Sequence, residues 1–132
     1  MSLTIEGSAV ERGVYCVIQT PLDENDNIDN DVLKREIDWL ITGGVKGLVL
    51  AMVSEVMRFS AAERRNQWQI VLRILDGRLP LIVSVGGEST AIAVELAKAA
   101  ESDGATALIA TPPASFPATS SEIYSYYTAL IE

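Results

Sequence analysis

The sequence predicts an α/β protein built around a parallel β-sheet, because strand patterns and helix patterns alternate four times. The strand patterns are apolar runs without polar alternation, typical of strands buried on both faces; they span 14–20, 47–52, 80–85 and 106–111. Their first residues are 33, 33 and 26 positions apart, a natural length for one strand and one helix. Right-handed crossovers then give a parallel array.

A flavodoxin-like sheet and part of a (β/α)8 barrel both fit this parallel array. A complete barrel needs at least about 200 residues, so this chain of 132 residues has room for half of one.

The helix patterns have recognisable ends. The first is expected from about residue 31 to residue 42, where two glycines follow. A Ser-x-x-Glu pattern at 60–63 and a Thr-x-x-Glu pattern at 119–122 predict capping boxes, in which the two side chains satisfy exposed amides at a helix start. The expected helices therefore span 31–42, 60–76, 89–102 and 119 to the end of the chain.

Composition restricts the possible functions. The chain is 48% hydrophobic and 21% charged, which suits a globular protein, and no apolar run reaches the length of a membrane span. Residues 1–12 contain no apolar block, so no secretory signal is expected. The net charge of −8 disfavours a nucleic-acid partner. The chain has no histidine and one cysteine, so neither a Cys-ligated zinc site nor a disulfide framework is expected. The single cysteine fits a cytoplasmic location. Cys16, inside an apolar run, is expected to be a buried, inert thiol.

Three loops have sequences that partly match ligand-binding motifs, but a structural role explains each of them better. No Gly-x-Gly-x-x-Gly follows the first strand, which disfavours a dinucleotide site. The acidic stretch 23–31 fails as a calcium loop, since Ile28 and Lys34 occupy the positions that need glycine and a bidentate glutamate. It is expected to be a solvated turn with a helix cap at position 29 or 30. In the Gly86-Gly87 turn, a following glutamate would repel an anion, so a tight turn with a cap is expected.

The segment 51–55 follows the second strand, at the edge of the sheet where α/β proteins bind ligands. Ser54 is a possible donor to a carboxylate, and Glu55 is a possible acid or base or an anchor for the loop. From residue types alone, a plain connecting loop is the leading interpretation.

Three prolines within 112–117 predict a rigid loop that forms a pocket wall. The tyrosines at 124, 126 and 127 are expected in the core or at an interface.

The three lysines constrain the chemistry. Lys34 and Lys98 fall inside predicted helices, and Lys46 precedes the second strand, at the end opposite the ligand edge. A lysine that forms a Schiff base must reach the substrate carbonyl. This stretch is therefore not expected to supply such a nucleophile.

Several ordered motifs together resemble the dihydrodipicolinate synthase / N-acetylneuraminate lyase family. They are Gly13–Pro21, Ile37–Leu48, Ser60–Arg64, Gly77–Ile82, Val85–Thr90, Glu95–Ala100 and Thr111–Pro113. The resemblance implies a (β/α)8 barrel, with residues 1–12 as an N-terminal extension and 13–132 as the N-terminal half of the barrel. It also implies a class I (Schiff-base) aldolase or dehydratase acting on a 2-oxo acid such as pyruvate or a 2-keto-3-deoxy sugar acid.

The resemblance places the main catalytic groups outside this sequence. The family's Schiff-base lysine lies on strand six and its catalytic tyrosine after strand five, so both would fall beyond Glu132. No catalytic residue is therefore expected in this segment, which alone should be inactive. No cofactor and no metal are implied.

The family's carboxylate-binding motif, usually Gly-Thr-Thr-Gly-Glu, aligns with 51–55, where only the glutamate matches. The hydroxyl donors are replaced by apolar side chains, so backbone amides and Ser54 are expected to hold the carboxylate, and Thr20 to support the pocket floor. The family's tyrosine after strand four aligns with Ala114. These departures favour a sugar-acid branch over dihydrodipicolinate synthase activity. The predicted substrate-binding residues are Thr20, Met52, Val53, Ser54 and Glu55.

A second hypothesis belongs to another class. A half-barrel exposes two sheet edges and apolar surface. The segment could then be a non-catalytic module that pairs with a copy of itself or with another partner. The resemblance implies a small 2-oxo acid substrate and a homo-oligomer, and neither hypothesis requires a nucleic acid or a membrane.

Overall fold

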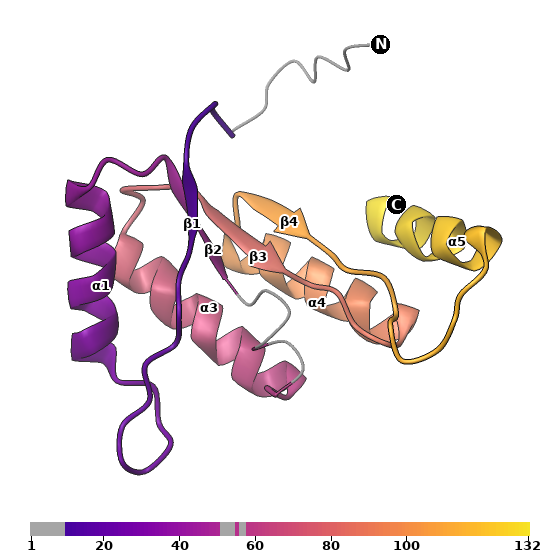
Figure 1. The fold of residues 1–132 in the computed structure, drawn as a ribbon, viewed down its shortest axis with the longest axis horizontal. Helices are drawn as coiled ribbons and strands as arrows, with labels where there is room; N and C mark the ends of the chain where they lie inside the picture. The colour runs from indigo at the N-terminus through magenta and orange to yellow at the C-terminus, as the bar shows by residue number, and fades with distance from the viewer. Residues whose placement is uncertain (1–9, 51–54, 56–57) are drawn as a thin grey trace.

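The computed structural model describes residues 10–50, 55 and 58–132. Strands and helices alternate along it (Figure 1). The strands are β1 (Tyr15–Val17), β2 (Gly47–Leu50), β3 (Leu81–Ser84) and β4 (Ala107–Ile109). The helices are α1 (Asn30–Thr42), α3 (Ala61–Leu75), α4 (Thr90–Asp103) and α5 (Ser120–Ile131). The predicted order of elements is therefore confirmed over the described ranges.

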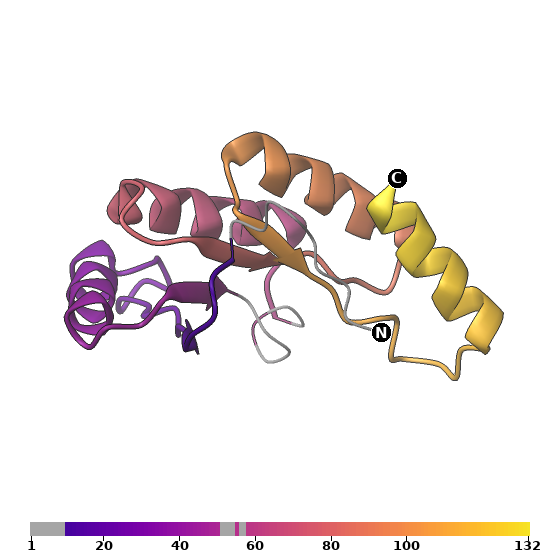
Figure 2. The same cartoon turned by 90° about the horizontal axis from the view of Figure 1, so that it is seen from above.

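The strand order distinguishes the two folds that the sequence left open. All described strand pairs are parallel, and the spatial order β1-β2-β3-β4 is the order along the chain. The helices follow one side of the curved sheet, and α1, α3, α4 and α5 pack in sequence against one another (Figure 2). A flavodoxin-like sheet reverses its strand order and carries helices on both faces. The described elements are instead consecutive units of a (β/α)8 barrel.

The core lies between the sheet and these helices. Leu48 pairs with Leu81 and Leu50 pairs with Val83, so their side chains form two rows on the face toward the helices. Each fully buried aliphatic or aromatic side chain contributes about 1.5–3 kcal/mol. Core residues from the helices include Leu33, Ile37, Trp68, Val71, Leu96 and Ala100.

The opposite face of the sheet is the side that would form the inside of a barrel. One row across it joins Val17, Val49, Ile82 and Ala107. Val49 in the middle of the sheet is 7% exposed, whereas Val17 at its edge is 41% exposed. The edge strands β1 and β4 each pair on one side within the described part of the chain. The sheet is therefore open at both edges there.

Helix starts follow the predicted capping chemistry with one difference. Both capping boxes form, at Ser60 with Glu63 and at Thr119 with Glu122. Asp29 caps α1 by accepting from the amides of residues 31 and 32. Ser89 is the N-cap residue of α4, in agreement with the expected cap, although its side chain makes no cap hydrogen bond.

The strands are shorter than their apolar runs, because the ladder ends where the chain turns into the loops. Single hydrogen bonds extend it, with Ile18 N donating to Val49 O at 3.1 Å and Val85 N donating to Ile109 O at 2.8 Å. These residues begin the loops at the carboxyl edge. Within the described residues, no helix is long and apolar enough to cross a bilayer.

Candidate functional site

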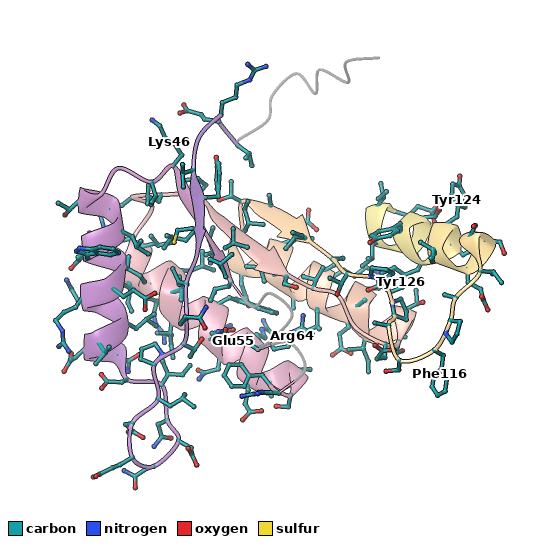
Figure 3. The ribbon with its side chains drawn as sticks, in the orientation of Figure 1. Lys46, Glu55, Arg64, Phe116, Tyr124 and Tyr126 are labelled. Carbon is teal, nitrogen blue, oxygen red and sulfur yellow. The ribbon has the colours of Figure 1, made fainter. Side chains whose placement is uncertain are left out.

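The candidate site lies at the carboxyl ends of the strands, where the loops after β1 to β4 begin. Glu55 and Arg64 lie at this edge, while Lys46 lies at the other end of the sheet (Figure 3). Because the strands are parallel, every one of these loops starts from the same edge. This edge is where the sequence placed its candidate binding residues.

Thr20, Glu55 and Gln67 form a hydrogen-bonded cluster at this edge. The amide nitrogen of Thr20 donates to Glu55 Oε1 at 2.8 Å, and its hydroxyl donates to Glu55 Oε2 at 3.1 Å. Gln67 Nε2, from α3, donates to Glu55 Oε2 at 2.8 Å and also contacts the Thr20 hydroxyl. The carboxylate thus accepts from the loop after β1 and from α3 together. This geometry favours an anchoring role for Glu55 over a role as acid or base.

The predicted binding residues divide into two groups. Thr20 and Glu55 are brought into direct contact. Met52, Val53 and Ser54 lie outside the described residues. Gln67 was missed by sequence reasoning, although one signal was available: it is a polar residue on the stripe of α3 that also carries Trp68 and Val71. Gln67 is 1% exposed.

Arg64 is a second buried polar residue that sequence reasoning missed. It is 4% exposed, and its guanidinium donates to Ser84 O at 2.6 Å and to Gly86 O at 3.0 Å. Burial lowers the pKa of Arg64, with an opposing effect from the nearby Tyr126 hydroxyl. The side chain fixes the carboxyl end of β3 to the first turns of α3.

The loops after β3 and β4 are tied together by Glu88. Its carboxylate accepts from Ala114 N at 3.0 Å and from Ser115 N at 3.2 Å. These backbone hydrogen bonds hold the pKa of Glu88 below its usual value. The sequence predicted a rigid loop at 112–117, and Glu88 supplies a contact that orders it. Phe116, further along this loop, is exposed.

Tyr126 adds a bridge from α5 to the same two loops (Figure 3). Its hydroxyl accepts from Gly87 N and donates to Thr111 O, both at 3.1 Å. Burial raises the pKa of Tyr126, the largest effect on it. As expected, Tyr126 is a core residue; Tyr124 is 75% exposed.

The remaining groups to place are the lysines, Cys16 and a possible metal site. Lys34 lies on α1, Lys98 lies on α4, and Lys46 precedes β2. Cys16 is half-buried and packs against the core. The described ranges hold no group of three or more His, Cys, Asp or Glu side chains arranged for a metal.

Consecutive parallel βα units with loops joined at the carboxyl edge define the N-terminal part of a (β/α)8 barrel enzyme fold. A family model for the dihydrodipicolinate synthetase family matches residues 11–132. The chain belongs to the dihydrodipicolinate synthetase family.

Individual relatives agree with this assignment. The chain is 35% identical over 122 residues to N-acetylneuraminate lyase 2 of Escherichia coli O6:H1, covering 92% of this chain and 40% of that protein. Among solved structures, N-acetylneuraminate lyase from Fusobacterium nucleatum is similar at 27% identity and a TM-score of 0.82, covering 90% of this chain and 42% of that one. The fold also matches 4-hydroxy-tetrahydrodipicolinate synthase from Methylacidiphilum fumariolicum SolV at 23% identity and a TM-score of 0.85, covering 91% of this chain and 40% of that one. The chain thus spans about 40% of the length of the curated relatives it matches.

Proposed function

We propose that this chain is the N-terminal half of a class I lyase that acts on a 2-oxo acid, with the Schiff-base lysine outside residues 1–132. The observation that carries the proposal is the family match over 11–132, joined to a run of βα units that spans about 40% of a lyase relative. The three lysines support it by their positions, since all lie in helices or before β2. Residues 13–132 then form the half-barrel, and 1–12 an extension.

In this proposal the chain's own residues bind and orient the substrate. The segment 51–55 holds the substrate carboxylate, through backbone amides and Ser54, with Met52 and Val53 as the apolar side of the pocket. Thr20 and Glu55 form its floor, a role supported by their two direct hydrogen bonds. The apolar residues at 52 and 53 favour a 2-keto-3-deoxy sugar acid over the substrates of dihydrodipicolinate synthases. The complete protein is a cytoplasmic homo-oligomer.

Borohydride trapping with pyruvate tests this proposal. A lysine amine that attacks the 2-oxo carbon expels water and leaves an imine, which borohydride reduces to a stable amine. The complete protein should gain the mass of one reduced pyruvate per chain, and only when pyruvate is present. The 132-residue chain should gain none. A complete protein that forms no adduct at saturating pyruvate rules the proposal out.

A second function is favoured by one observation, the two open edges of the described sheet. Leu108 and Ile109 on β4 are 40% and 37% exposed, and Val17 on β1 is exposed as well. A module of this length that pairs with its own copy would cover them. The intact mass separates the two functions: a mass of 14.2 kDa with a dimer in light scattering favours the paired module. A longer polypeptide favours the lyase.

A further inference from the structure

We propose that Gln67 is a positioning residue that sets the orientation of the Glu55 carboxylate and the Thr20 hydroxyl at the substrate-binding edge. This inference rests on the proposed function, because it assigns these two residues to the binding of a 2-oxo acid. Gln67 is on α3, whose other buried side chains, apart from Arg64, are apolar. Its side-chain amide donates from that helix to the Glu55 carboxylate.

The hydrogen-bond directions show what Gln67 contributes. Its amide nitrogen carries two hydrogens, and it contacts two acceptors, Glu55 Oε2 and the Thr20 hydroxyl oxygen. The Thr20 hydroxyl then directs its own hydrogen to Glu55 Oε2. The amide therefore fixes which way the hydroxyl donates and which oxygen of the carboxylate turns toward α3.

The burial of Gln67 argues against a packing role alone. The side chain is 1% exposed, and its Oε1 has no hydrogen-bond partner within the described residues. An unpaired buried acceptor destabilises a fold, and an apolar side chain of similar size would avoid that loss. The hydrogen bonds of Nε2 compensate for the unpaired Oε1. We therefore assign the role of Gln67 to its two N–H donors.

Glu55 is the residue through which Gln67 acts. It is the described residue next to 51–54, and its carboxylate joins the loop after β1 to α3. With the Gln67 donors removed, the two Thr20 contacts are what the carboxylate keeps among the described residues. A carboxylate free to turn would leave the adjacent part of the substrate site without a fixed support. The expected effect is on substrate binding, since Gln67 itself is too deeply buried to touch a substrate.

Exchanging the two side chains provides the sharpest test. Gln67→Glu replaces both donors with an acceptor and sets two carboxylates face to face. In the double variant Glu55→Gln/Gln67→Glu, the new amide at 55 can accept from Thr20 N and donate to the new carboxylate. The exchange restores the number of donors and acceptors without changing net charge. Gln67→Met keeps the volume of the side chain and removes its hydrogen bonds.

The measurement is borohydride trapping by the complete protein over a range of pyruvate concentrations. Gln67→Glu and Gln67→Met should raise the half-saturating pyruvate concentration about tenfold, the size expected for a lost hydrogen bond to a charged group. The maximal extent of trapping should stay unchanged, and the exchanged pair should return the half-saturating concentration toward the original value. Gln69→Met is the matched control, because Gln69 lies on the same helix and also donates to a carboxylate, that of Asp103.

Two results of the trapping measurement would overturn the inference. One is an unchanged half-saturating concentration in Gln67→Met; the other is an exchanged pair no better than Gln67→Glu. Hydrogen exchange at the Thr20 amide separates this inference from the proposed function. If the unmodified protein forms no pyruvate adduct, the lyase proposal fails by itself. Even then, if the Thr20 amide hydrogen exchanges faster in Gln67→Glu and this is reversed in the double variant, Gln67 is the residue that orients Glu55. If the rate of amide hydrogen exchange at Thr20 is unchanged in Gln67→Glu, the inference about Gln67 is refuted.

Discussion

At the scale of single residues, buried polar side chains organise the carboxyl edge of the sheet. Glu55 and Thr20 belong to a pattern visible in the sequence, since Thr20 ends the first apolar strand run and Glu55 follows the second. Gln67 and Arg64 could not be placed there from sequence, because their roles depend on which helix face meets which strand end. Only the packed fold brings Arg64 to the carbonyls of residues 84 and 86.

Gly86 provides a residue-scale prediction with a neighbouring control. A Cβ at Gly86 would lie 2.7 Å from both the backbone nitrogen and the backbone oxygen of Thr111, so neither atom can move away cheaply. Gly86→Ala should lower the free energy of unfolding by about 1–3 kcal/mol, the usual cost of overpacking. At Gly87 the nearest atom would be 3.9 Å away. Urea unfolding of Gly87→Ala should then show little change, and equal losses in the two variants would contradict this explanation.

At the scale of elements, local rules predicted helix starts well and strand ends less well. Both capping boxes were visible as spacings, because a capping box is made by residues three apart. The strand ends were not visible, because residues such as Ile18 and Val85 are apolar and buried but already belong to the loops. Hydrophobicity reports burial, and it does not report where the ladder stops.

The packing of α3 against α4 depends on Asp103. Its carboxylate accepts from Arg65 at 2.9 and 3.0 Å, from the Trp68 indole at 2.8 Å and from Gln69 at 3.1 Å. These hydrogen bonds, with Arg65 the largest contributor, lower the pKa of Asp103 to about 2.

This lowered pKa predicts how stability varies with pH. A folded-state pKa below the ordinary 3.8 means that Asp103 stabilises the fold above that value, and that this stabilisation is lost as pH falls toward 2. Asp103→Asn should therefore be less stable than the unmodified protein at pH 6, and the difference should shrink between pH 4 and pH 2. Urea titrations at each pH measure it. Glu101→Gln, an exposed change on the same helix, is the control, and a difference for Asp103→Asn that does not vary with pH contradicts the assignment.

At the scale of the whole molecule, alternation predicted the parallel sheet but could not choose between two folds. A flavodoxin-like sheet and a half-barrel share the same sequence of strands and helices. They differ in which strands are neighbours and which face the helices cover, and both depend on long-range packing. The order β1-β2-β3-β4 makes that choice, and the exposed edge residues follow from it.

The most direct measurement is to locate the reduced pyruvate adduct by peptide mapping of the complete protein. We predict that the adduct lies on a lysine outside residues 1–132, because Lys34 and Lys98 lie within helices and Lys46 precedes β2. An adduct on any of these three lysines would contradict the proposed half-barrel lyase.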